Sequence, residues 1–192
     1  MARNIVIIGI LAEGQKDDIK RILDAEVRRL NFDIETLFIE RADDLSAVDA
    51  LVLPRGKSLR FGEIMCGTAL GKSIAEFSKH KPLLAICGSV IACTKRLGKG
   101  CEGRKTIGII DAKVDNNCLD GDHKVTLANR RACIGNFTAA PVLSEMGKKV
   151  EAIAMTDGQI VAMKQGNIFG FCYIDYTGRS YDSFLRAVMN KQ

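Results

Sequence analysis

Three short apolar runs that alternate with helical patterns occupy the first half of the chain and strongly limit its fold. The runs are NIVIIGI at 4–10, DIETLFIE at 33–40 and DALVLP at 49–54. Such runs are typical of strands that helices cover on both faces. Between the first two, apolar residues recur at helical spacing from Ile19 to Leu30, and a second, glycine-interrupted helix is expected from about Leu59 to Lys79. Repeated strand–helix units of this kind predict an α/β fold with an open, doubly wound, mostly parallel sheet.

The second half of the chain is rich in strand patterns. Four segments carry them: TIGIIDAKV at 106–114, HKVTLA at 123–128, VEAIAMTDGQIVAMKQG at 150–166 and IFGFCYI at 168–174. Within the third segment, Asp157-Gly158 is typical of a tight hairpin turn. A last helix is expected from about Ser180 to Asn190. The chain has 192 residues and no linker or repeat, so one domain over 1–192 is predicted.

Charge and cysteine content exclude several classes of protein. The net charge is +5, and the Lys and Arg residues are scattered, so nucleic acid is not an expected partner. No apolar run reaches the roughly 20 residues of a membrane span, and the first ten residues do not resemble a secretory signal. Both observations predict a cytoplasmic protein. The seven cysteines are odd in number and include no CxxC pair, so no disulfide framework, metal site or cofactor is predicted.

The stretch KPLLAICGSVIAC at 81–93 indicates a reactive site. A buried strand at 83–86 ends on Cys87, and Gly88 and Ser89 allow a sharp turn into a helix. Ligand crevices of open parallel sheets lie at the carboxyl ends of the strands, and the start of a helix favours a thiolate. Cys87 is therefore a candidate nucleophile, expected to be a partly exposed thiolate that iodoacetamide modifies before the other six cysteines. The alternative is a small buried apolar residue, as most isolated cysteines are.

Four segments together resemble the class I, triad-type glutamine amidotransferases. They are LVLPRGKS at 51–58, KPLLAICGSVIAC at 81–93, AAPVL at 139–143 and DGQIVAMKQGNIFGFCYID at 157–175. Within that superfamily the chain is most similar to the glutaminase subunits of pyridoxal 5'-phosphate synthase, from the first strand to the terminal helix. The resemblance implies a flavodoxin-like three-layer sandwich. It also implies hydrolysis of glutamine to glutamate, with the ammonia passed to a partner synthase.

The same resemblance assigns roles to residues in two of these segments. In the family an elbow cysteine attacks the glutamine amide, backbone donors of the loop after the third strand bind the oxyanion, and a histidine with a glutamate partner activates the thiol. Cys87, followed by Gly88, matches the nucleophile. The oxyanion loop is matched by Arg55, Gly56 and Lys57, although Arg55 replaces a glycine of the family and Lys57 replaces an acidic residue.

The base is where the chain departs from the family. The His-Pro-Glu segment of the family aligns with YIDY, which places Ile174 where the histidine belongs and Tyr176 where the glutamate belongs. The chain has two histidines. His80 precedes the elbow strand, so it is expected on the surface at the opposite edge of the sheet from Cys87. His123 lies in the region of a substrate-side loop of the family and is the candidate for a surrogate base.

A sister group of the same superfamily, the DJ-1/PfpI-like proteins, offers another interpretation. There a glutamate after the first strand hydrogen-bonds the elbow cysteine, and Glu13 occupies that place here. The segments AICGSVIA and LVLPRG resemble both groups. The later segments AAPVL and DGQIVAMKQG follow the amidotransferase pattern.

Three functions are compatible with these residues. The first, which the missing base favours, is a divergent amidotransferase-like protein or pseudoenzyme with impaired glutamine hydrolysis that binds glutamine or another small molecule. The second is an active glutaminase with a surrogate base. The third is a DJ-1-like protein whose cysteine acts in redox sensing or in detoxification of small molecules. A synthase subunit is the partner that the resemblance implies, and a homo-oligomer is also compatible with the sequence.

Overall fold

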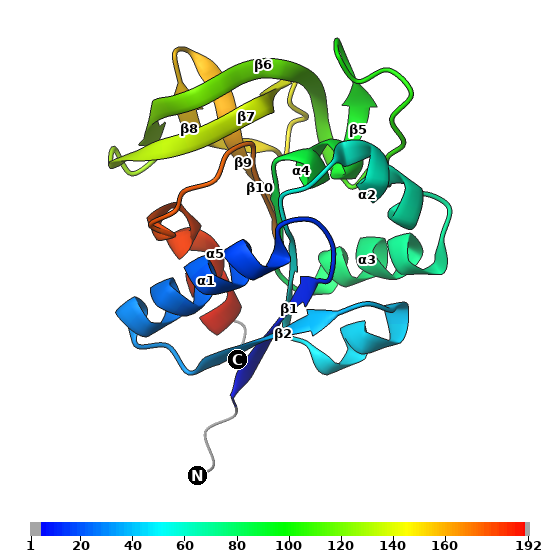
Figure 1. Cartoon of the computed structure of the whole chain (residues 1–192), viewed down its shortest axis with the longest axis vertical. Coiled ribbons are helices and arrows are strands. Elements are labelled where there is room, and N and C mark those ends of the chain that lie inside the picture. Colours follow the sequence, from blue (N-terminus) through cyan, green and yellow to red (C-terminus); the bar gives the residue numbers. More distant parts are fainter. Residues whose placement is uncertain (1–4, 191–192) are drawn as a thin grey trace.

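The first half of the chain forms the expected strand–helix units. The computed structural model describes residues 5–190, apart from the side chain of Asn117, and Figure 1 shows its trace. The elements up to the elbow are β1 (Val6–Leu11), α1 (Lys16–Leu30), β2 (Ile34–Ile39), a 3-10 helix (Ala42–Ala47), β3 (Ala50–Leu53), α2 (Ser58–Met65), α3 (Ala69–His80) and β4 (Leu83–Ile86). Asn4, the expected start of the first strand, lies outside the described residues.

The single helix predicted from Leu59 to Lys79 is in fact two helices. After α2 ends, Gly67 takes a left-handed φ of 77°, a conformation that costs glycine little. Thr68 then caps the N-terminus of α3, because its side-chain oxygen accepts a hydrogen bond from the Gly71 N–H at 3.1 Å. The apolar spacing predicted helical structure over this span, but a glycine and a capping threonine divide it.

Five parallel strands form one half of a ten-stranded sheet. Their order is β2-β1-β3-β4-β10, the order of flavodoxin-like folds, and every neighbouring pair in it is parallel. The strand β10 (Ile168–Phe171) comes from late in the chain and lies beside β4. The loops that follow β1, β3 and β4 therefore meet at one edge of this half.

The other half of the sheet is built from hairpins. Its strands are β5 (Thr94–Leu97), β6 (Ile110–Leu127), β7 (Ala132–Ser144), β8 (Glu151–Thr156) and β9 (Gln159–Gln165). All of its pairings are antiparallel except that of β5 with β6. The predicted strands at 106–114 and 123–128 are parts of the long strand β6. Its partner β7 is not predicted, because CIGNFTAAPV mixes small and polar residues with few branched ones.

The prediction of a mostly parallel sheet therefore holds for one half only. Of the ten strand pairings, five are parallel and five, including that of β9 with β10, are antiparallel. Short hairpin connections cause this, since parallel neighbours need long crossovers. The predicted turn at Asp157-Gly158 is confirmed, with φ values of 48° and 76°, the left-handed pair of a type I′ turn.

Helices cover both faces of the parallel half. On one side lie α1 and α5 (Asp182–Met189), and on the other lie α2 and α3, as Figure 1 shows. On the first side, Arg29 of α1 forms an ion pair of 2.9 Å with Asp182 of α5, which links the two helices. The parallel strands β3 and β4 between the layers are fully buried. Among residues 5–190, no helix is both long and apolar enough to cross a membrane.

Candidate active site

Cys87 lies at the sharp turn between β4 and the short helix α4 (Gly88–Cys93). Its backbone has φ 54° and ψ −116°, a combination that only glycine adopts without strain. The Cys87 N–H donates to the Phe171 carbonyl oxygen of β10 at 2.7 Å. Parallel pairing thus continues to the last residue before the turn. The elbow predicted from AICGSV is present.

Two residues after the cysteine fix this turn to its surroundings. Gly88 allows the closest approach, because a Cβ atom at this position would lie 2.0 Å from the Gly56 carbonyl oxygen. The Ser89 hydroxyl accepts from the Ile86 N–H at 2.8 Å and lies 2.9 Å from the Leu53 carbonyl oxygen, to which it donates. The small residues of the elbow therefore allow it to pack closely against the loop that follows β3.

The Cys87 thiol is buried and protonated. Its exposed fraction is 6%, and burial raises its pKa to about 12, against the opposing effect of the Arg55 charge. The Sγ atom donates to the Cys172 carbonyl oxygen at 3.5 Å. The prediction of a partly exposed thiolate is therefore wrong. Burial disfavours the charged form, and α4, with six residues, does not offset that effect.

This burial reverses the expected order of chemical labelling. We expect iodoacetamide at pH 8 to modify the exposed Cys118 well before Cys87, because a pKa of about 12 leaves about one thiol in ten thousand ionised. Peptide mass mapping of a time course would measure both sites, and unfolding in urea should remove the difference. Faster labelling of Cys87 in the native protein would contradict the buried, protonated thiol.

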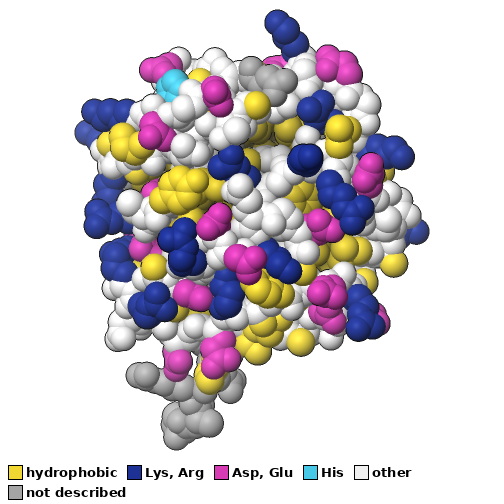
Figure 2. Space-filling model, viewed as in Figure 1, with side chains coloured by type: hydrophobic (Ala, Val, Ile, Leu, Met, Phe, Trp, Pro, Cys, Tyr) yellow, Lys and Arg dark blue, Asp and Glu magenta, His cyan; other side chains and the backbone are white. Residues whose placement is uncertain are grey.

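A cleft of about 670 Å³ opens above the elbow. Its walls come from the loop after β1, the loop after β3 with the start of α2, the elbow, the connection between β5 and β6, and two segments of β6 and β7. The lining residues are Glu13, Gly14, Gln15, Arg55, Gly56, Lys57, Ser58, Leu59, Arg60, Phe61, Cys87, Gly88, Ile91, Arg104, Asn116, Thr138, Ala139 and Pro141. The structure thus brings the predicted nucleophile and the predicted oxyanion loop, 55–57, into one cleft. In Figure 2, Lys and Arg side chains border the hollowed upper part of the face shown.

The arrangement of elbow, loop and cleft agrees with comparison to known proteins. A model of the SNO glutamine amidotransferase family matches residues 9–189. The chain belongs to this family. A curated relative, the pyridoxal 5'-phosphate synthase subunit PdxT of Shouchella clausii, is 29% identical over 96% of this chain and 96% of its own length. A second relative of that name, from Thermococcus onnurineus, is 25% identical over 84% of this chain and 87% of its own length.

Solved structures show the same fold. The crystal structure of a glutamine amidotransferase has a TM-score of 0.81 at 20% identity, and the match covers 95% of this chain and 98% of that one. A glutamine amidotransferase from Thermotoga maritima has a TM-score of 0.58 at 11% identity and covers 98% of this chain and 84% of its own. The fold of this chain is therefore that of glutamine amidotransferases.

The positions that match the histidine and glutamate of the family hold no base. Ile174 is fully buried, and its backbone exchanges two hydrogen bonds with Asn136, at 2.8 and 3.0 Å. Tyr176 is 56% exposed. Neither Ile174 nor Tyr176 lines the cleft. The substitutions inferred from the sequence therefore leave this part of the family site without a proton-transfer group.

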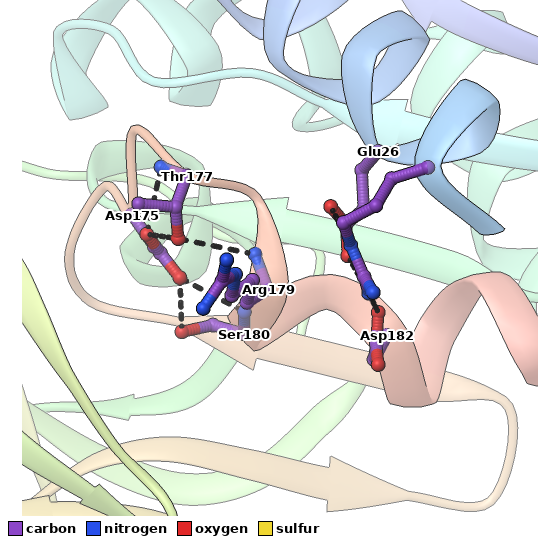
Figure 3. A network of polar contacts seen from close by, with 7 residues as sticks. Glu26, Asp175, Thr177, Arg179, Ser180 and Asp182 are labelled. Carbon is purple, nitrogen blue, oxygen red and sulfur yellow. Dashed lines mark hydrogen bonds and ion pairs between the residues drawn. The ribbon is translucent and has the colours of Figure 1, made fainter.

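Asp175, between these two positions, has a structural role. It is fully buried, and its carboxylate accepts from the N–H and hydroxyl of Thr177, at 2.9 and 2.6 Å, and from those of Ser180, at 2.9 and 2.8 Å. Figure 3 shows this network beside the Glu26–Arg29–Asp182 contacts that join α1 and α5. The segment that aligns with the catalytic groups of the family is held here by contacts within the turn that precedes the 3-10 helix Arg179–Tyr181.

Neither histidine lines the cleft. His80 is exposed and lies 3.2 Å from Glu76 on α3, so its predicted surface position is confirmed. His123 lies on β6, where Nε2 is 2.9 Å from the Asp120 carbonyl oxygen and Nδ1 is 3.4 Å from the Asp157 carboxylate. The ring also packs edge-on against Phe137. The suggestion that His123 acts as a surrogate base gains no support from these contacts.

Glu13 lines the cleft, but its carboxylate contacts an arginine and not the cysteine. Its carboxylate forms an ion pair of 3.1 Å with Arg60 of α2. Within residues 5–190 no hydrogen bond joins Glu13 to Cys87. The contact on which the DJ-1-like interpretation depends is absent from the described part of the chain.

Several cleft residues are not predicted from the sequence. Arg104, in the irregular connection between β5 and β6, donates from Nε to the Ser58 hydroxyl at 2.8 Å. Arg60 and Asn116 also line the cleft. The run KRLGKGCEGRK at 95–105 is visibly basic, yet nothing in its spacing indicates that one of its arginines turns back to α2. Among the described residues, no group of three or more His, Cys, Asp or Glu could hold a metal ion.

Proposed function

We propose that this chain is a divergent member of the glutaminase-type glutamine amidotransferases that has lost glutamine hydrolysis. The observation that carries the proposal is the composition of the cleft, in which no described lining residue is a histidine. A general base must lie within about 3 Å of the proton that it removes. Cys87 instead donates to the Cys172 carbonyl oxygen, which cannot accept a proton and return it to a leaving group.

The state of the thiol supports the same conclusion. Attack on the glutamine amide requires a thiolate, and departure of ammonia requires a proton donor. In the family one histidine performs both steps. With a pKa near 12, Cys87 is protonated at neutral pH, and Ile174 can neither take nor return its proton. Both activation and general acid catalysis are therefore missing.

The proposal extends to the biological setting. The curated relatives are named as subunits of pyridoxal 5'-phosphate synthase, so a synthase subunit in the cytoplasm is the partner we propose. The chain would act as one domain, since all ten strands belong to one sheet. In this view the protein keeps the fold and the cleft of an ammonia-donating subunit, and binds a ligand without hydrolysing glutamine.

Glutamine hydrolysis by the purified chain tests this proposal. We expect ammonia release to be lower by about 10³-fold or more than that of an active glutaminase, because the acid–base step is missing. The assay would be run with and without a pyridoxal 5'-phosphate synthase subunit, with the Shouchella clausii relative and its synthase as the positive control. Cys87→Ala should leave the residual rate unchanged. Release at the rate of the relative, abolished by Cys87→Ala, would contradict the proposal.

A further inference from the structure

The cleft above Cys87 carries an excess of positive charge. Four basic side chains line it, Arg55, Lys57, Arg60 and Arg104, against one acidic side chain, Glu13. Glu13 is already paired with Arg60 at 3.1 Å. Within residues 5–190 the other three basic side chains form no ion pair with a carboxylate. Within residues 5–190, Arg55 and Lys57 therefore have no carboxylate partner, and Arg104 acts on the Glu102 carboxylate only through its charge, which helps to lower the Glu102 pKa.

Two of these cations are held in place. Arg104 is half-buried, and its Nε donates to the Ser58 hydroxyl at 2.8 Å, which fixes the guanidinium at the first residue of α2. Arg55 is also half-buried, its Nη1 donates to the Asn136 Oδ1 atom at 3.5 Å, and its charge acts on the Cys87 thiol at the floor of the cleft. Both therefore contribute to the cleft itself and not merely to the surrounding surface.

The start of α2 adds to the positive potential. Ser58, Leu59 and Arg60 line the cleft. The helix has no acidic residue in its first turn, and its N-cap residue, Lys57, makes no side-chain capping hydrogen bond. Helices normally carry negative charge at this end, because their first N–H groups and dipole favour anions. Here the sequence places Lys57 there instead. An anion bound in the cleft would offset this unfavourable arrangement.

The charges do not match glutamine. Free glutamine is electrically neutral at pH 7, since it carries one carboxylate and one ammonium group. The ammonium group would need an acceptor. Glu13, the acidic side chain that lines the cleft, already forms an ion pair with Arg60. Three cations that form no ion pair within residues 5–190 instead match a ligand with two negative charges.

We propose that the cleft binds a small dianion, of the phosphate or dicarboxylate class, through Arg55, Lys57 and Arg104. This inference rests on the proposed loss of glutamine hydrolysis, because the dianion would occupy the site in which the family binds its substrate. The apolar side chains of Phe61, Ile91 and Pro141 line the same cleft. They would exclude water around the ligand and strengthen its contacts with the cations.

Isothermal titration calorimetry of the full chain in low-salt Tris chloride tests the inference. The probes are inorganic phosphate and succinate as the two dianions, with glutamine as the neutral comparison. We expect saturable binding of at least one dianion, weakened by added salt, and weaker or undetectable binding of glutamine. Binding of phosphate alone would identify the phosphate class, and binding of succinate alone would identify the dicarboxylate class.

Charge-removing variants locate the binding. We expect Lys57→Gln and Arg104→Gln each to weaken dianion binding by about tenfold, the usual effect of one charged hydrogen bond. Lys72→Gln, at an exposed lysine on α3 outside the cleft, is the matched control and should leave binding unchanged. Thermal unfolding without ligand would check that each variant folds. Absence of binding by both dianions, or binding that Arg104→Gln and Lys57→Gln leave unchanged, would overturn the inference.

The same protein samples separate this inference from the proposed function. Rapid glutamine hydrolysis would refute the proposed function, whatever the calorimetry shows. Slow or absent hydrolysis together with no dianion binding would refute the inference alone.

Discussion

Asp175→Ala should lower the free energy of unfolding by about 3 kcal/mol or more, measured by urea denaturation. The carboxylate is fully buried and accepts four hydrogen bonds from Thr177 and Ser180. Alanine would leave these donors without an acceptor, and the buried Ser180 N–H cannot turn to water. The segment between β10 and α5 would lose the contacts that fix it.

Two further variants make the Asp175 test specific. Asp175→Asn keeps the size of the side chain and one acceptor oxygen, but its NH₂ group faces hydrogen-bond donors. We therefore expect a decrease in the free energy of unfolding that is smaller than that of Asp175→Ala. Asp33→Ala, at an exposed position before β2, should change stability by less than about 0.5 kcal/mol. A loss for Asp175→Ala as small as that of Asp33→Ala would show that the network does not stabilise the fold.

Gly88→Ala should destabilise the protein by about 3 kcal/mol, the upper part of the range for overpacked sites. The new methyl group would lie 2.0 Å from the Gly56 carbonyl oxygen and 3.0 Å from the Ser58 nitrogen. Both are backbone atoms, so the elbow and the loop after β3 must separate. That movement would also widen the cleft above Cys87.

Gly170→Ala is the matched comparison, because Gly170, in β10, is likewise a buried glycine of the parallel half. Its added methyl group would meet the Met163 Sδ atom at 3.0 Å, and a methionine side chain can move aside. We therefore expect Gly170→Ala to lower the free energy of unfolding, measured by urea denaturation, by less than about 1 kcal/mol. Equal losses for the two variants would show that the close approach at Gly88 is not what limits substitution there.

The parallel half and the elbow could be predicted from the sequence because their signals are local. Branched apolar runs indicate buried strands, and a cysteine followed by Gly88 and Ser89 indicates a sharp turn. The antiparallel half was harder to predict. The long strand β6 contains polar stretches, and β7 pairs with it through register shifts after Asp115 and Leu119. Such pairing depends on contacts between the strands and leaves a weak pattern in either one.

The chemistry of the cleft was predicted less well than its location. Whether Cys87 is ionised depends on how deeply the elbow is buried, and neighbouring residues in the sequence do not determine that depth. The partner of Glu13 could not be predicted either, because Arg60 approaches it only through the folding of α2 against the loop after β1. Arg104 enters the cleft from an irregular segment, for which apolar spacing carries no information.

The place of β10 in the sheet has a consequence for how the chain folds as it is synthesised. This strand lies between β4 and β9, yet it follows all the other described strands in the chain, and Ile168 pairs with the distant Leu83. While a ribosome is still making residues before 168, β1 to β4 and β5 to β9 can each pair, but the two groups have no strand to join them. Each then has an open edge in the middle of the future sheet, where unpaired backbone invites association with other chains. The sheet closes only when its central strand arrives, after a long loop-closure step that slows folding.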